Sequence, residues 1–241
     1  MTTTLFYGVP GTGKTQAMAD IVAAHSDEQL FFVVDITNDW SLSEENLRWR
    51  GNVPKGLVFG QAEYDEFFKH VRAAEEGGYK HGRVESAEKF IAENDHTGVL
   101  VFQFPFRPWE VAEYAKAVGN SVFVSDEIDT VATYKDWDIN PLKDFVHRGR
   151  HLPNRNGEMG TMGILGAARR PQSLHTDITS LADEIFVFRV NGKRTIDRLI
   201  GDSVIDSTKD LEVIELPNMH YLKWTATGER APGRITNPWG E

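Results

Sequence analysis

The sequence predicts an α/β domain with a mainly parallel central sheet and helices on both faces. Three observations lead to this fold class. Continuous apolar runs alternate with segments of helical periodicity, several of these runs end on charged residues, and a glycine-rich segment separates the first run from the first helix. Because ligands of parallel sheets bind beyond the carboxyl ends of the strands, polar residues at these ends are the first candidates for a functional site.

The order of the elements follows from these patterns. Continuous apolar runs are typical of strands that are covered on both faces, and Pro108 suits the first turn of a helix. Two further segments, 213–216 and 221–224, predict a C-terminal β-hairpin across Pro217 and Asn218. We expect strands at residues 2–7, 30–34, 56–59, 99–102, 121–125, 162–166 and 184–190, and helices at residues 15–24, 64–75, 86–94 and 108–118.

Length and composition limit the classes of protein. The 241 residues suit one domain, which we place at residues 1–225, followed by an extended tail at residues 226–241. The absence of cysteine excludes a disulfide framework and thiolate metal sites, and no apolar run approaches the roughly 20 residues of a transmembrane helix. We therefore expect a soluble cytoplasmic protein. The net charge of −10 argues against indiscriminate binding of nucleic acid, so any contact with DNA must be local.

The glycine-rich segment is a complete phosphate-binding motif. Its glycines allow backbone N–H groups to turn toward phosphate oxygens, Lys14 can reach the β- and γ-phosphates, and the Thr15 hydroxyl suits a Mg²⁺ ligand. We predict ATP and Mg²⁺ as cofactors. The expected nucleotide-binding residues are Gly8, Val9, Pro10, Gly11, Thr12, Gly13, Lys14, Thr15 and Gln16.

A pair of acidic residues follows the apolar run at residues 121–125. We assign Asp126 to Mg²⁺, through water, and Glu127 to the attacking water, because hydrolysis at a phosphate-binding loop needs both functions. Asp129 is the reserve candidate. The alternative interpretation is that the pair only caps the helix that follows.

Residues 143–170 are locally cationic, with a net charge of +4 in an acidic chain. They fit two roles: an arginine that reaches the γ-phosphate of a neighbouring subunit, and contact with a polyanion. A solvated basic face is the alternative. For the arginine we rank Arg150 first, then Arg148, then Arg155. Lys143, Arg155 and Arg170 are the candidates for DNA contact.

Two histidines, His147 and His151, are four residues apart in this segment. This spacing suits a metal site on a helix, but no third ligand is evident. A structural or phosphate-facing role is the better interpretation.

Two protein families share short motifs with this sequence. AAA+ ATPases resemble it at residues 5–15 and at the motif Asp126-Glu127-Ile128-Asp129. However, Lys14 and Asp126 are 112 residues apart, which is far more than is usual in AAA+ ATPases, and too little helical sequence follows Asp183 for the AAA+ lid.

The second resemblance is to the FtsK–HerA superfamily, particularly the genome-packaging ATPases of membrane-containing double-stranded DNA viruses and their Zot-like relatives. It rests on Arg-Gly-Arg-His at residues 148–151, Gly-Ile-Leu-Gly-Ala-Ala-Arg-Arg-Pro at residues 163–171, and Leu-Ala-Asp-Glu-Ile-Phe-Val-Phe-Arg at residues 181–189. It covers residues 5–189, with residues 37–92 unmatched. Where that superfamily commonly has a glutamine sensor, this sequence has Arg169, which becomes a candidate for charge stabilisation.

This resemblance implies a five-stranded core with extra edge strands, in a P-loop NTPase that assembles as a hexameric or pentameric homo-oligomeric ring. ATP would bind between subunits and double-stranded DNA would pass through the pore. Capsid or virion membrane proteins are the further partners, and the host cytoplasm and the virion vertex are the expected locations.

The leading functional hypothesis is a DNA-translocating ATPase that packages a viral genome. The alternatives are a Zot-like or AAA+-like ATPase that remodels protein during virion assembly, and a nucleotide-gated assembly module with negligible hydrolysis. A small-molecule kinase is a weaker alternative, because acidic residues at a strand end suit water activation better than transfer to a bound acceptor.

Overall fold

The computed structural model describes residues 3–37, 40, 56–76, 85–103, 107–135, 137–149, 151–153, 159–202, 204 and 212–235. The candidate arginines Arg150 and Arg155 lie outside these residues. No helix among the described residues is both long and apolar enough to cross a membrane.

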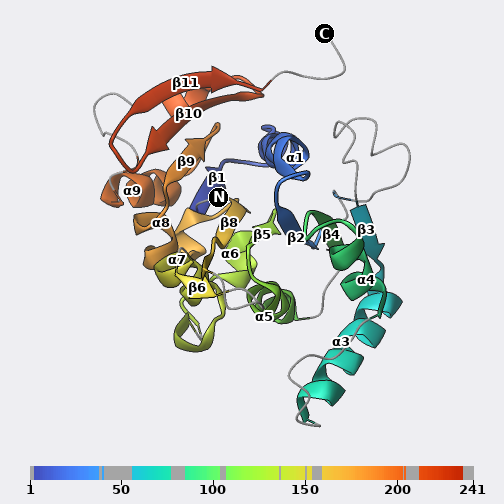
Figure 1. Cartoon of the computed structure of the whole chain (residues 1–241). Coiled ribbons are helices and arrows are strands. Elements are labelled where there is room, and N and C mark those ends of the chain that lie inside the picture. The colour runs from blue at the N-terminus through green and yellow to red at the C-terminus, as the bar shows by residue number, and fades with distance from the viewer. Residues whose placement is uncertain are drawn as a thin grey trace.

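The continuous apolar runs form a central sheet (Figure 1). Within the described part of the chain its nine strands lie in the order β11-β10-β9-β1-β8-β5-β2-β4-β3, and all neighbours from β9 to β3 are parallel. This confirms the mainly parallel sheet with extra edge strands. The strands are β1 (Thr3–Tyr7), β2 (Leu30–Asp35), β3 (Gly56–Phe59), β4 (Gly98–Gln103), β5 (Ser121–Ser125), β8 (Gly163–Ala168), β9 (Glu184–Val187), β10 (His220–Thr225) and β11 (Arg230–Arg234). A separate ribbon pairs β6 (Leu152–Pro153) with β7 (Met159–Gly160).

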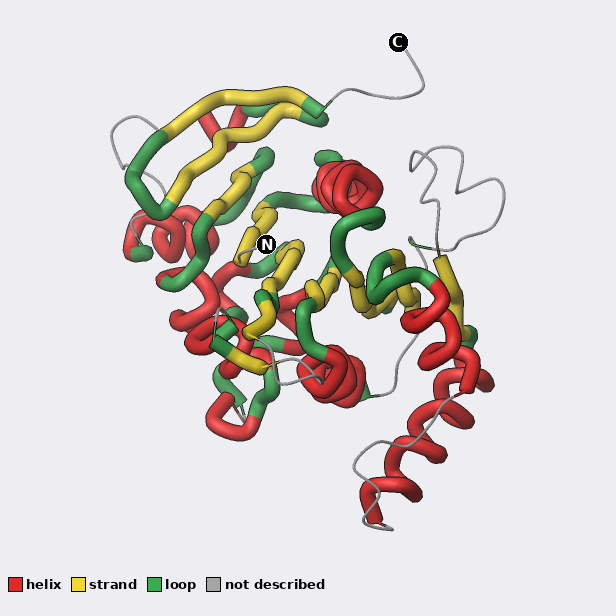
Figure 2. Tube along the Cα trace, viewed as in Figure 1, coloured by secondary structure: helices red, strands yellow, loops and turns green. Residues whose placement is uncertain are grey.

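Each face of the sheet has its own hydrophobic core, because successive side chains of a strand point to opposite faces. Leu5 and Tyr7 pack into one core and Phe6 into the other. Helix α1 (Lys14–His25) covers the Phe6 face, and most other helices cover the opposite face (Figure 2). These others are α3 (Gln61–Glu76), α4 (Glu85–Glu93), α5 (Pro108–Val118), α6 (Ile128–Val131), α7 (Leu142–Arg148), α8 (Thr176–Ser180), α9 (Lys193–Gly201) and α10 (Glu212–Glu215).

The C-terminal hairpin exists, but only one of its two predicted strands is correct: residues 221–224 lie in β10, whereas residues 213–216 do not form its partner strand. Val213 lies in the short helix α10, and β10 pairs instead with β11, inside the predicted tail. An apolar run of about four residues cannot be distinguished from one turn of helix by periodicity. The true partner strand is polar and contains Pro232, a residue that an edge strand tolerates because one side of it makes no ladder hydrogen bonds.

Gly149 joins α7 to the start of β8. Its N–H donates to the Phe145 carbonyl, and its carbonyl accepts from the Met162 N–H at 2.8 Å. A Cβ at this position would meet the Phe145 carbonyl oxygen and would lie 2.5 Å from that of Met162. Only glycine fits between these two backbone segments.

We therefore expect Gly149→Ala to lower the free energy of unfolding by about 1–3 kcal/mol, through overpacking against backbone. Thermal unfolding followed by circular dichroism measures this. The matched control is Gly201→Ala, because a Cβ at Gly201 meets nothing within 4 Å. Equal melting temperatures for the two variants would contradict this account of the junction.

Candidate nucleotide-binding site

The glycine-rich loop connects the carboxyl end of β1 to α1. Gly11 and Gly13 have φ angles of 76° and 103°, in the left-handed region that favours glycine. The Val9 carbonyl accepts two hydrogen bonds, from the Thr12 hydroxyl at 2.8 Å and from Lys14 Nζ at 2.9 Å. These bonds hold the loop closed and place the ammonium group of Lys14 across it.

Lys14 is a buried cation, with 7 % of its surface exposed. Burial, the main cause, and the positive charge of Arg169 lower the pKa of Lys14 from 10.5 to about 8. The carboxylates of Asp129, Asp126 and Glu127 act in the opposite direction. An anion held in the loop would likewise favour the protonated ammonium group, so the site is electrostatically suited to phosphate.

Three adjacent strands bring the candidate residues to one edge of the sheet. The loop follows β1, Arg169 follows β8, and Asp126 and Glu127 follow β5, with β8 between the other two. Parallel strands end at the same edge. The fold therefore places Lys14, Arg169 and the acidic pair together, as the sequence predicts.

The two members of the acidic pair have different surroundings. Asp126 is buried and accepts a hydrogen bond of 2.5 Å from the Thr37 hydroxyl, beyond the end of β2. Glu127 is partly exposed and forms an ion pair of 2.8 Å with Arg169. The buried carboxylate suits a fixed ligand, while the more accessible carboxylate suits contact with water.

The oxygens at this edge also fit a hard cation. Thr15 supplies a hydroxyl and Asp126 a carboxylate, which are the donors that Mg²⁺ takes from a protein when phosphate and water complete its shell. No group of three or more histidine or acidic residues among those described could hold a metal by itself. Asp129, the reserve candidate, instead accepts the Arg170 N–H at 3.0 Å, and burial raises its pKa. It supports the segment that follows β8.

The described cationic residues of the 143–170 segment are dispersed. Lys143 forms an ion pair of 2.7 Å with Asp138, Arg148 is exposed at the end of α7, and the side chain of Arg170 is exposed beyond β8. The first-ranked Arg150, and Arg155, lie outside the described residues. The roles of these five cations in binding or catalysis stay predictions.

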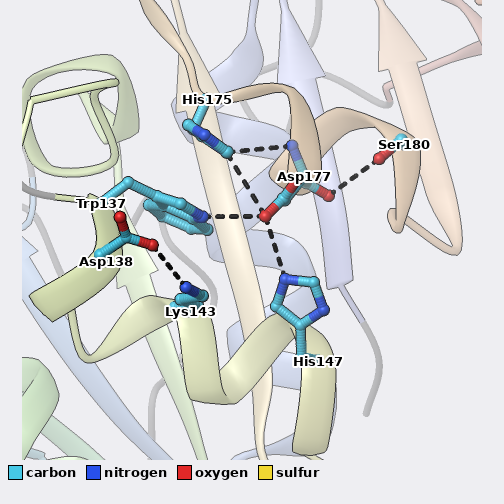
Figure 3. A network of polar contacts seen from close by, with 7 residues as sticks. All are labelled: Trp137, Asp138, Lys143, His147, His175, Asp177 and Ser180. Atoms are coloured by element: carbon cyan, nitrogen blue, oxygen red, sulfur yellow. Dashed lines mark hydrogen bonds and ion pairs between the residues drawn. The ribbon is translucent and has the colours of Figure 1, made fainter.

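His147 has a structural role, one of the two that the sequence suggests. Its Nε2 lies 3.0 Å from Asp177 Oδ2, which also accepts a hydrogen bond from Trp137 Nε1 at 2.9 Å (Figure 3). The Trp137 ring stacks on His175, whose Nδ1 is 3.5 Å from the same carboxylate oxygen. The bond from His147 is the main cause that lowers the pKa of Asp177. This network fixes α7 against α8.

Sequence reasoning missed two contributions to the site. One is Thr37, which follows an apolar strand without any motif to mark it. The other is the C-terminal turn: the Met219 N–H donates to the Thr12 carbonyl at 3.0 Å, which ties the hairpin to the glycine-rich loop. No local pattern signals a contact across more than 200 residues.

Several solved structures share this fold along the whole chain. The genome packaging NTPase B204 of Sulfolobus turreted icosahedral virus 2, in complex with AMPPCP, matches with a TM-score of 0.62 and 13 % identity over 98 % of each chain. The DNA-packaging ATPase B204 of Sulfolobus turreted icosahedral virus matches with a TM-score of 0.59 and 16 % identity, again over 98 % of each chain. At these identities the likeness shows that this chain shares the fold of these two proteins.

A bacterial protein extends the comparison. VirB4 of Thermoanaerobacter pseudethanolicus matches with a TM-score of 0.58 and 11 % identity, over 97 % of this chain and 89 % of VirB4. No protein-family model matches the chain, and no curated protein matches its sequence. The predicted resemblance to FtsK–HerA-type ATPases is thus confirmed at the level of the fold.

The buried charge of Lys14 predicts a pH-dependent stability. Because its pKa is about 8 in the folded protein and 10.5 in the unfolded chain, folding penalises the protonated form fully below pH 8 and not at all above pH 10.5. We expect Lys14→Met to raise the free energy of unfolding of the nucleotide-free protein by about 1–3 kcal/mol at pH 7, and this gain to shrink between pH 8 and 10.5.

Urea unfolding at pH 7, 9 and 10.5 measures this gain. Lys143→Met is the matched control, because Lys143 lies in an exposed ion pair and removal of such a pair changes stability little. A gain from Lys14→Met that stays constant across this pH range would show that the buried charge is not its cause.

Proposed function

We propose that this protein hydrolyses ATP to move double-stranded DNA, as the packaging motor of a viral genome. The observation that carries the proposal is the convergence of Lys14, Arg169 and the Asp126–Glu127 pair at the carboxyl ends of three adjacent strands. The fold shared with two viral packaging ATPases supports the choice of DNA as the moving partner.

In this proposal the loop N–H groups and Lys14 hold the β- and γ-phosphates. Thr15 and Asp126 hold Mg²⁺, which would neutralise charge on the phosphate oxygens. Glu127 orients the attacking water and accepts its proton. These assignments use a buried carboxylate for the metal and a more accessible one for water, as the two environments favour.

The ion pair between Glu127 and Arg169 suggests how the nucleotide prepares the site. A γ-phosphate beside Lys14 would compete with Glu127 for the guanidinium group of Arg169, because both are anions within its reach. Arg169 would then stabilise phosphate charge, and Glu127 would be released to bind water. Hydrolysis would thereby depend on a filled site.

The position of α7 supports an arginine that acts on a neighbouring subunit. Gly149 is hydrogen-bonded to Met162, at the amino end of β8, whereas Arg169 follows the carboxyl end of that strand. Six residues of strand separate these ends by about 20 Å. Arg148 directly precedes Gly149, so it lies closer to the amino end of β8 than to the phosphate loop of its own chain. We propose a homo-oligomeric ring in which an arginine of this segment, Arg150 first and then Arg148, completes the next subunit's site.

The same ring would present Lys143, Arg155 and Arg170 as the candidates for contact with DNA. We place it in the host cytoplasm and at the virion vertex, with capsid or virion membrane proteins as further partners.

Replacing Glu127 with Gln tests the proposed role of this carboxylate. We expect ATP turnover to fall roughly 10²–10⁴-fold, because an amide cannot accept the proton of the attacking water, while ATP binding is kept. Phosphate release and binding of a fluorescent ATP analogue separate the two effects, and Glu229→Gln on the hairpin is the exposed control. Unchanged turnover in Glu127→Gln would remove Glu127 from the mechanism.

DNA dependence tests the proposed function itself. We expect double-stranded DNA to stimulate ATP turnover several-fold at low salt, and the stimulation to fall steeply as salt rises, because phosphate contacts release counterions. A synthetic polyanion of equal charge is the control. Robust turnover with neither DNA stimulation nor DNA binding would overturn the proposal, and stimulation by a coat protein instead would favour the protein-remodelling alternative.

A further inference from the structure

The C-terminal turn and the end of β11 are built onto the phosphate loop. Besides the bond from the Met219 N–H to Thr12, the Met219 carbonyl accepts the Ile235 N–H at 2.8 Å. Met219 has a φ of 66°, which is uncommon for a residue other than glycine. The two backbone bonds hold it in this conformation, against the loop.

The side chains of these residues lie over one glycine of the loop. A Cβ at Gly13 would be 2.6 Å from Met219 Sδ and 3.4 Å from Ile235 Cδ1. Ile235 is buried, and Met219 keeps part of its surface exposed. An apolar wall of one thioether and one alkyl group thus stands beside the start of α1, at the end of the loop.

Sheet order determines which part of a nucleotide faces this wall. Strand β8 lies on one side of β1, followed by β5, while β9 and the hairpin lie on the other side. The proposed mechanism places the γ-phosphate near Glu127 and Arg169, beyond β5 and β8. A triphosphate that lies across the loop then directs its α-phosphate, ribose and base toward the hairpin.

We propose that Met219 and Ile235 form the subsite for the nucleobase. The inference rests on the proposed function, since it needs a nucleotide with its γ-phosphate at Glu127. Sulfur contacts with an aromatic ring are favourable, and a methionine adapts to a flat ring. Neither side chain carries a strong hydrogen-bond donor or acceptor. The subsite therefore contributes affinity for any purine base and little discrimination between adenine and guanine.

The test compares ATP with inorganic tripolyphosphate, which has the phosphates but no base. We expect Met219→Ala and Ile235→Ala each to weaken ATP binding roughly 3–30-fold, and GTP binding by a similar factor. Binding of tripolyphosphate should stay within about twofold of the unmodified protein, because the backbone bonds to the loop remain. Isothermal titration calorimetry measures all three ligands.

Controls separate this inference from the proposed function and from misfolding. Lys14→Ala should weaken ATP and tripolyphosphate alike, whereas Ile214→Ala, at an exposed isoleucine of α10, should change neither. Met219→Leu keeps the volume and should retain ATP affinity within about threefold. If Met219→Ala does not fold, Ile235→Val gives the same comparison with a smaller change, again for ATP alone.

Two results would overturn the subsite: ATP affinity unchanged in both alanine variants, or ATP and tripolyphosphate weakened by equal factors, which would make the turn only a support of the loop. An unmodified protein that binds neither ligand would instead overturn the proposed function, and the subsite with it.

Discussion

The position of β8 between β1 and β5 is the constraint on which the rest of the site depends. Its register pairs Ala168 with Tyr7 and Gly166 with Ser125, so the residue after β8 lies between the loop and the acidic pair. Gly166 contributes in a second way. A Cβ there would be 3.0 Å from Ile128 Cβ. Because Gly166 has no Cβ, the turn after Asp126 and Glu127 can pack directly on the sheet.

The electrostatic cost to stability is concentrated around the phosphate loop and Arg169. Burial of Lys14 beside Arg169 opposes the charge that the loop needs, and Arg169 is held in turn by Glu127. Such an arrangement lowers the stability of the empty site and favours an anionic ligand, because a bound anion relieves the repulsion between the two cations. The site is thus arranged for a ligand with several negative charges, rather than for maximal stability of the free protein.

The sequence predicts the strands and the longer helices around this site well. It predicts the short helices between them, and the contacts from distant segments, poorly. The limits of α5 and β5 agree with the predicted residues 108–118 and 121–125, because a proline and a bounded apolar run mark their ends. Helices α6 to α9 are short, and the sequence pattern does not predict them. Thr37 and Met219 reach the site from distant segments, through a hydroxyl and a backbone N–H. Neither group leaves a pattern in a single sequence, so their contribution required the fold.

Strand β8 also connects the side of the sheet where the parallel strands begin with the side where they end. At its amino end the Met162 N–H binds Gly149, which follows α7, and α7 is fixed to α8 through His147 and Asp177. At its carboxyl end Arg169 holds Glu127. A rigid parallel strand transmits position along its length, and residues 164–166 of β8 pair with both neighbouring strands. In the proposed ring, the end of α7 would face one neighbouring subunit, while Arg169 lies beside the phosphate loop of its own chain. The six residues of β8 would therefore place both groups.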